Sequence, residues 1–191
     1  TADSRLQIQL FKIPAALADL GTVATLLWWL RRRGLPLAGV AVYAWSPLAI
    51  WEFWGTGHND AILLFFMALS FALASAGRSL PAYLALAAAV ATKLWPAMLL
   101  PKLWLTTGRK WTVLLVVPLW AALAWPYLAD VTENAQFVSG FLGGWRNNDS
   151  LFGLILAVTA DPYQAKYVAF GILAVVAGWM TFSNRPRESA A

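Results

Sequence analysis

Apolar runs of membrane-spanning length, separated by short polar clusters, occupy most of this sequence. Hydrophobic residues make up 60% of the 191 residues and charged residues 12%, whereas a soluble domain is about half apolar and a quarter charged. About 20 apolar residues in a helix cross the hydrocarbon core of a bilayer, because each residue rises about 1.5 Å. The sequence therefore predicts an all-α fold, a polytopic transmembrane helical bundle.

About seven membrane segments are predicted, two of them short. The single spans are placed at 11–30, 35–54, 61–76, 112–128 and 164–182. The remaining apolar stretch contains Lys93, followed by Pro96 and Pro101. Proline lacks an amide donor and clashes with the preceding helical turn, so it breaks a helix. That stretch is predicted to be a hairpin of two short helices, 80–92 and 95–106.

The distribution of charge favours the hairpin. With it, the basic clusters share one face, which the positive-inside rule makes cytoplasmic: Arg31, Arg32, Arg33, Arg78, Arg109, Lys110, Arg185 and Arg187. Without it, the second half of the chain inverts and the clusters split between two faces. With the hairpin, most acidic residues fall on the outer face. Residues 1–191 are predicted to form a single transmembrane domain, the middle or C-terminal part of a longer protein.

Composition excludes several function classes. The net charge of +5 does not indicate nucleic-acid binding, because the basic residues lie in short clusters between apolar runs. The chain has no cysteine and a single histidine, His58, which rules out thiolate catalysis and a histidine-rich metal site. No P-loop, dinucleotide fingerprint or metal-ligand spacing is found, and no metal site is predicted. No cofactor is therefore indicated, although outer carboxylates are compatible with a divalent cation.

A polar turn at residues 55–60 is the clearest candidate site. Glycines on both sides of Thr56 allow a tight turn that leaves His58, Asn59 and Asp60 near the membrane surface. His58 or Asp60 could bind or activate a polar substrate there. The alternative is structural, because Asn59 or Asp60 could cap the helix that begins at Ala61.

Three embedded charges form the second group of candidates. Lys93 is predicted at the outer tip of the hairpin, where an ammonium can hold a lipid phosphate or simply reach the headgroups. Lys12 and Asp19 are seven residues apart and share a helix face. An intramembrane charge needs a partner, so they are interpreted as a structural pair in which Asp19 neutralises a cation, either Lys12 or Lys93.

The last candidates lie at residues 145–149. Arg146 could bind a phosphate, while Asn147, Asn148 and Asp149 could bond to sugar hydroxyls and Trp145 could face a sugar ring. The structural alternative is that Asp149 or Ser150 caps a helix beginning at Leu151.

Four motifs follow one another along residues 12–152: KIPAALADL at 12–20, SP…GHNDA at 46–61, TKLWP…LP at 92–101 and WRNNDSLF at 145–152. As an ordered set they resemble polytopic bacterial glycosyltransferases of the GT-C class. The similarity is greatest to mannosyltransferases that use polyprenyl-phosphate mannose. The resemblance implies a multi-pass protein of the bacterial inner membrane.

The resemblance also implies a reaction. A sugar, expected to be mannose, leaves a polyprenyl-phosphate donor for a hydroxyl of a glycan or glycolipid on the outer face. Basic residues hold the phosphate, here Lys93, His58 and Arg146, and a carboxylate acts as base. Family members usually carry that carboxylate in the first outer loop. The chain is expected to begin after that loop, so Asp60 takes its place as the catalytic candidate. Asn59, Trp145, Asn147, Asn148 and Asp149 would contact sugar or acceptor.

Two other functions fit the sequence. A transporter or flippase of a lipid-linked or small polar solute would need charges that line a path through both leaflets. The embedded charges of this chain instead concentrate towards the outer side. A non-catalytic membrane subunit is the other alternative.

Overall fold

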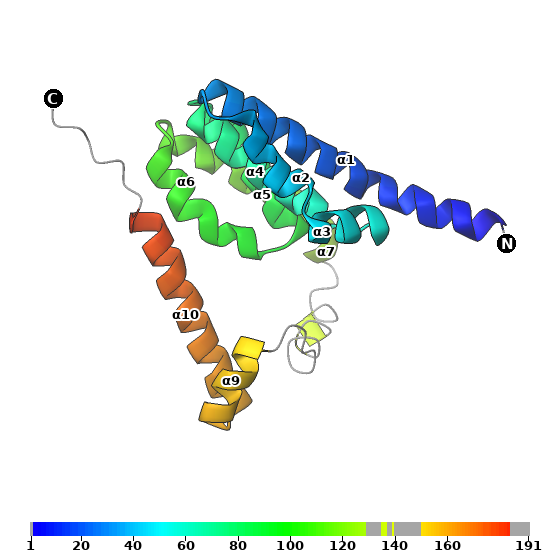
Figure 1. Ribbon diagram of the computed structural model, residues 1–191. Coiled ribbons are helices and arrows are strands. Elements are labelled where there is room, and N and C mark those ends of the chain that lie inside the picture. Colours follow the sequence, from blue (N-terminus) through cyan, green and yellow to red (C-terminus); the bar gives the residue numbers. More distant parts are fainter. Residues whose placement is uncertain (1, 129–134, 137–138, 140–149, 184–191) are drawn as a thin grey trace. The chain divides into compact units, whose positions relative to one another are not determined.

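The computed structural model describes residues 2–128, 135–136, 139 and 150–183 (Figure 1). Every regular element in these residues is helical, which confirms the all-α fold. The chain divides into two compact units, unit 1 at Thr1–Ala121 and unit 2 at Ala122–Ala191. The count of seven membrane segments and the single transmembrane domain stay predictions.

Two helices in the described residues are long and apolar enough to cross a membrane. They are Gln9–Arg32 within α1 (Ala2–Arg32), and α10 (Pro162–Ser183). At about 1.5 Å per residue, both are as long as the hydrocarbon core is thick. They correspond to the predicted spans 11–30 and 164–182.

The predicted span 35–54 is wrong as a continuous helix. The structure divides it into a 3₁₀ turn η1 (Leu37–Val40), helices α2 (Ala41–Ala44) and α3 (Pro47–Ala49), and a π-helical turn η2 (Ile50–Gly55). Pro47 explains the break, because proline disfavours helical geometry in the residue before it. Ser46 is accordingly extended, at φ −64° and ψ 119°, and its Oγ accepts a bond from the Ala49 amide.

Helix α4 (Asp60–Ser75) packs between α1 and α5 (Ser79–Thr92) (Figure 1). Helices α1 and α4 run parallel, since Gly21 lies against Phe65 midway along them and the Trp29 indole donates to Ser75 Oγ at 2.8 Å near their C-terminal ends. Small buried residues, among them Ala15, Ala18 and Ala61, bring the two backbones close.

The hairpin predicted at Lys93 is confirmed. Helix α5 ends at Thr92, Lys93 is extended at φ −151° and ψ 147°, and the chain returns through the 3₁₀ turn η3 (Trp95–Leu99) and α6 (Leu100–Thr106). Two contacts join the far ends of its arms: Tyr83 Oη lies 2.8 Å from Thr107 Oγ1, and the Arg109 amide donates to Ser79 Oγ at 3.2 Å.

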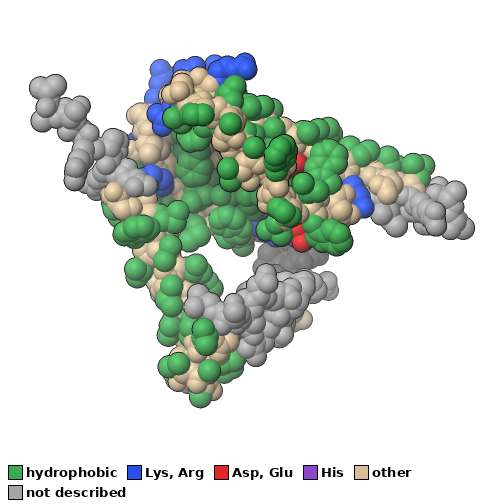
Figure 2. All heavy atoms as spheres, in the orientation of Figure 1, with side chains coloured by type: hydrophobic (Ala, Val, Ile, Leu, Met, Phe, Trp, Pro, Cys, Tyr) green, Lys and Arg blue, Asp and Glu red, His purple; other side chains and the backbone are tan. Residues whose placement is uncertain are grey.

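These contacts gather four arginines of unit 1 at one end. Arg31 and Arg32 end α1, and α4 ends beside them. Arg78 therefore lies at this end, and so does Arg109, through its bond to Ser79. Figure 2 shows Lys and Arg side chains gathered over the end of α1. We call this the arginine end of unit 1.

The predicted span 112–128 begins with a 3₁₀ turn, η4 (Lys110–Leu115), and continues as α7 (Val116–Leu128). Within unit 2, α9 (Ser150–Thr159) packs against α10. Ala160 joins them in the left-handed region at φ 56°. Asp161 Oδ1 then accepts a bond from the Tyr163 amide at 2.8 Å in the first turn of α10.

Candidate functional site

The turn between η2 and α4 is seated on α1. Gly57 adopts φ +75°, and a Cβ there would lie 2.8 Å from Lys12 Cγ and 3.2 Å from Lys12 Cα, so only glycine fits. Lys12 Nζ donates to the Gly55 carbonyl at 2.5 Å. The His58 amide donates to the Glu52 carbonyl at 2.8 Å. The backbone that carries His58 is therefore fixed from two sides.

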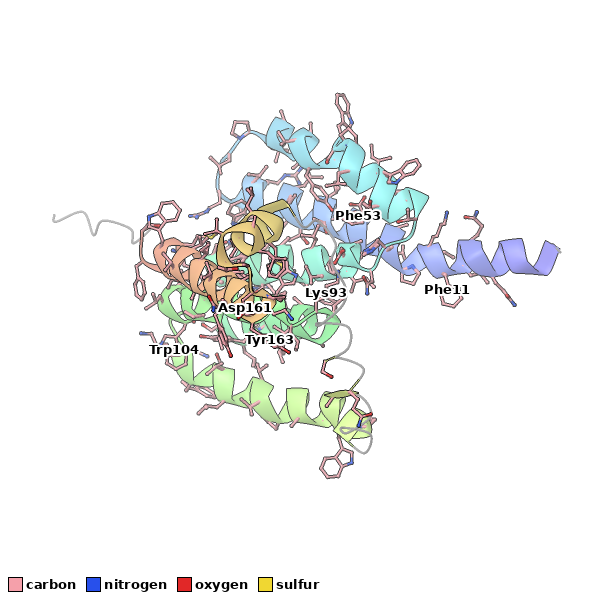
Figure 3. The ribbon with its side chains drawn as sticks, turned by 90° about the horizontal axis from the view of Figure 1, so that it is seen from below. Phe11, Phe53, Lys93, Trp104, Asp161 and Tyr163 are labelled. Atoms are coloured by element: carbon pink, nitrogen blue, oxygen red, sulfur yellow. The ribbon has the colours of Figure 1, made fainter. Side chains whose placement is uncertain are left out.

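Asp60, His58 and Lys93 meet at the end of unit 1 opposite the arginine end. Asp60 begins α4 and Lys93 follows α5, so the antiparallel pair brings them together. Asp60 Oδ2 lies 2.8 Å from His58 Nδ1, and Asp60 Oδ1 lies 2.5 Å from Lys93 Nζ. The three side chains are 36–48% exposed. Figure 3 labels Lys93 in this region. We call these three residues the Asp60 cluster.

The contacts of the cluster bear on the structural interpretation of the turn. Asn59 holds the N-cap position of α4 but its side chain makes no capping bond. The Asp60 carboxylate is engaged by an ammonium and an imidazole instead. The capping role expected for Asn59 or Asp60 is therefore wrong, and a charged group accessible from outside remains.

Asp19 has partners of a different kind. Only 8% exposed, it accepts a bond from Tyr43 Oη at 2.6 Å and another from Trp54 Nε1 at 2.9 Å. No contact among the described residues joins it to Lys12 or Lys93. The expected ion pair is therefore replaced by two neutral donors, and Lys12 caps a backbone carbonyl. We call Asp19, Tyr43 and Trp54 the Asp19 cluster.

A comparison with known proteins identifies the family. The family described as "Alpha-(1->6)-mannopyranosyltransferase, N-terminal domain" matches residues 3–109, more than half of the chain. The chain belongs to this family. The match confirms the resemblance to mannosyltransferases and covers both clusters. Neither a curated protein nor a solved structure matches the chain.

The chain thus combines the sequence of a glycosyltransferase family with apolar helices typical of a membrane protein. An apolar cavity of about 270 Å³ lies along its α5, lined by Tyr83, Leu86, Ala87, Val90, Leu100 and Val116 among others. Val90 is one helical turn before Lys93. Helix α5 therefore lines an apolar cavity and is followed directly by the Lys93 ammonium.

The candidate residues at 145–149 fall outside what the structure describes. Trp145, Arg146, Asn147, Asn148 and Asp149 all lie in 140–149, beyond the described residues. Their assigned roles stay predictions. In the described part of the mannosyltransferase domain, no group of three or more histidine, aspartate or glutamate side chains could hold a metal ion.

Sequence reasoning missed three residues that position this site. Tyr43 and Trp54 are not among the residues that the sequence analysis singles out, although both are donors that a buried carboxylate needs. Gly57 had been interpreted only as a flexible turn residue, whereas its contact with Lys12 requires glycine. A search for donors within reach of an embedded aspartate could have found the first two.

Proposed function

We propose that this chain is part of a GT-C class enzyme that moves mannose from a polyprenyl-phosphate donor to an acceptor hydroxyl. The acceptor is a glycan or glycolipid on the outer face of the bacterial inner membrane. The Asp60 cluster carries the proposal: two cationic or protonatable side chains and a carboxylate meet at an accessible end of the family-matched region. The alpha-(1->6) linkage in the description of the family supports attack by a 6-hydroxyl.

The polarity of unit 1 supports an outer site. The arginine end belongs in the cytoplasm by the positive-inside rule. The parallel packing of α1 and α4 places the Asp60 cluster at the other end of the same helices. A multi-pass arrangement with this orientation would present the cluster to the compartment where lipid-linked sugars are accepted.

Lys93 supports binding of the donor phosphate. An ammonium has three N–H donors, and the bond to Asp60 uses one of them. Leaving-group charge develops on the phosphate oxygens during transfer, and a nearby cation stabilises it. The apolar cavity on α5, whose lining includes Val90, would take part of the isoprenoid chain, while Arg146 is a predicted second cation.

The acceptor oxygen must also lose a proton as it attacks the sugar. His58 and Asp60 are the two groups in the cluster that can take one. The residues predicted to contact sugar or acceptor, which include Asn59, would orient that hydroxyl.

Transfer from radiolabelled polyprenyl-phosphate mannose to a mannoside with a free 6-hydroxyl tests the proposal in the intact protein, reconstituted in liposomes. Lys93→Ala is expected to lower transfer about 100-fold, mainly by lowering kcat, because the cation stabilises charge that develops on the phosphate in the transition state. Lys110→Ala, at the arginine end, is the matched control and is expected to retain activity. Unchanged turnover in Lys93→Ala would remove the phosphate-binding role.

The same liposomes separate the alternatives. Labelled lipid that crosses the bilayer without transfer would identify a flippase. No transfer and no crossing by the intact protein would identify a non-catalytic subunit.

A further inference from the structure

The two oxygens of the Asp60 carboxylate have different partners. One oxygen faces the Lys93 ammonium at 2.5 Å and the other faces His58 Nδ1 at 2.8 Å. Both oxygens of the Asp60 carboxylate are therefore already engaged by side chains. His58 is bound through Nδ1 alone, and no contact from a described residue engages its Nε2.

The contact between Asp60 and His58 Nδ1 selects one tautomer of the histidine. A carboxylate accepts a hydrogen bond, so the nitrogen that faces it must carry the proton. In the neutral imidazole the proton then lies on Nδ1, and Nε2 keeps its lone pair. The imidazole is 48% exposed, so a substrate hydroxyl can reach it.

The backbone around His58 is held in place. Its amide donates to the Glu52 carbonyl at 2.8 Å, and its carbonyl accepts from the Ala61 amide at 3.3 Å. Gly57, the preceding residue, packs on Lys12. A group that receives a proton in a transition state is effective only when its position is fixed beforehand.

We propose that His58 Nε2 is the proton acceptor of the transfer reaction and that Asp60 is a positioning residue acting through it; this rests on the proposed function. The acceptor O–H proton moves to Nε2 as the oxygen bonds to C1 of the sugar. The bond from C1 to the phosphate oxygen breaks, and its electron pair leaves with the polyprenyl phosphate beside Lys93. The imidazolium, stabilised by Asp60, later returns the proton to water.

His58→Asn in the intact protein tests the assignment. The asparagine amide can still donate to Asp60 from near the Nδ1 position, but nothing replaces Nε2. The expected result is a fall in kcat of about 100-fold or more, with the donor KM within about threefold and an unchanged melting temperature. Activity near that of the native protein would mean that His58 only holds Asp60, which overturns the proposal.

His58→Ala adds a second measurement, rescue by added imidazole, which would not change if His58 had only a structural role. Imidazole in the assay buffer is expected to restore transfer at least about tenfold by occupying the vacated space, and to leave Lys93→Ala unaffected. Absence of rescue in a folded His58→Ala protein, or an effect confined to the donor KM, overturns the assignment. If the native protein transfers no mannose, the proposed function fails; if it transfers mannose and His58→Asn does too, this inference alone fails.

Discussion

Unit 1 contains two aspartates near the same turn whose surroundings differ in almost every respect. Asp19 is 8% exposed and bonded to the neutral donors Tyr43 and Trp54. Asp60 is 36% exposed and contacts the cationic Lys93 and the titratable His58. A buried carboxylate with fixed neutral donors stabilises one packing arrangement. An accessible carboxylate among protonatable groups can rearrange charge during a reaction, so the comparison separates a scaffold from the proposed reaction site.

Asp60→Asn gives the largest expected effect. The amide cannot hold the Nδ1–H tautomer of His58 or compensate Lys93, so kcat for mannose transfer is expected to fall about 1,000-fold. The melting temperature in detergent should stay within a few degrees, because an accessible ion pair contributes little to stability. Asp161→Asn is the matched control, since Asp161 accepts a backbone bond in unit 2.

Combining Asp60→Asn with His58→Asn sharpens this prediction. If the two residues act together in one step, the double variant should be no less active than the less active of the two single variants. Multiplied losses would show instead that Asp60 and His58 contribute independently.

Asp19→Ala is expected to lower the stability of the protein, whereas Asp60→Asn is expected to lower its activity. Asp19→Ala leaves Tyr43 Oη and Trp54 Nε1 without their acceptor, and we expect a loss of about 2 kcal/mol of unfolding free energy. Thermal unfolding in detergent measures this change. Tyr43→Phe, which removes one donor, should cost less. Native thermal stability with abolished transfer would place Asp19 in the reaction instead of the scaffold.

The sequence predicted the break at Lys93 but not the break at Ser46–Pro47, and one physical difference explains both outcomes. At Lys93, a charge, two following prolines and the distribution of arginines all favour a break. At Ser46–Pro47, the flanking residues are apolar enough that length alone predicts one span, and only the local geometry of proline reveals the break. Hydropathy detects the membrane, but it does not detect interruptions within an apolar run.

The sequence predicted which residues belong to the candidate site, but it did not predict the contacts between them. His58, Asp60 and Lys93 were each recognised from residue type and place along the chain. Their mutual distances depend on the antiparallel packing of α4 and α5, which no local pattern contains. The pairing of Lys12 with Asp19 was wrong because seven residues of helix separate them by about 10 Å along the axis, so neutral donors from another segment reach Asp19 instead.

Gly57→Ala tests whether the scaffold positions the reaction site, and its expected effect is the smallest. The new Cβ would meet Lys12 Cγ at 2.8 Å and would need φ near +75°. Gly77→Ala isolates the backbone cost, because Gly77 has φ +76° with nothing within 4 Å. Both variants should lose about 1 kcal/mol for the left-handed conformation. Only Gly57→Ala should also lower mannose transfer, by about tenfold, since it pushes the turn that carries His58 away from α1. Equal transfer by the two variants would mean that the Asp60 cluster keeps its geometry without the support of α1.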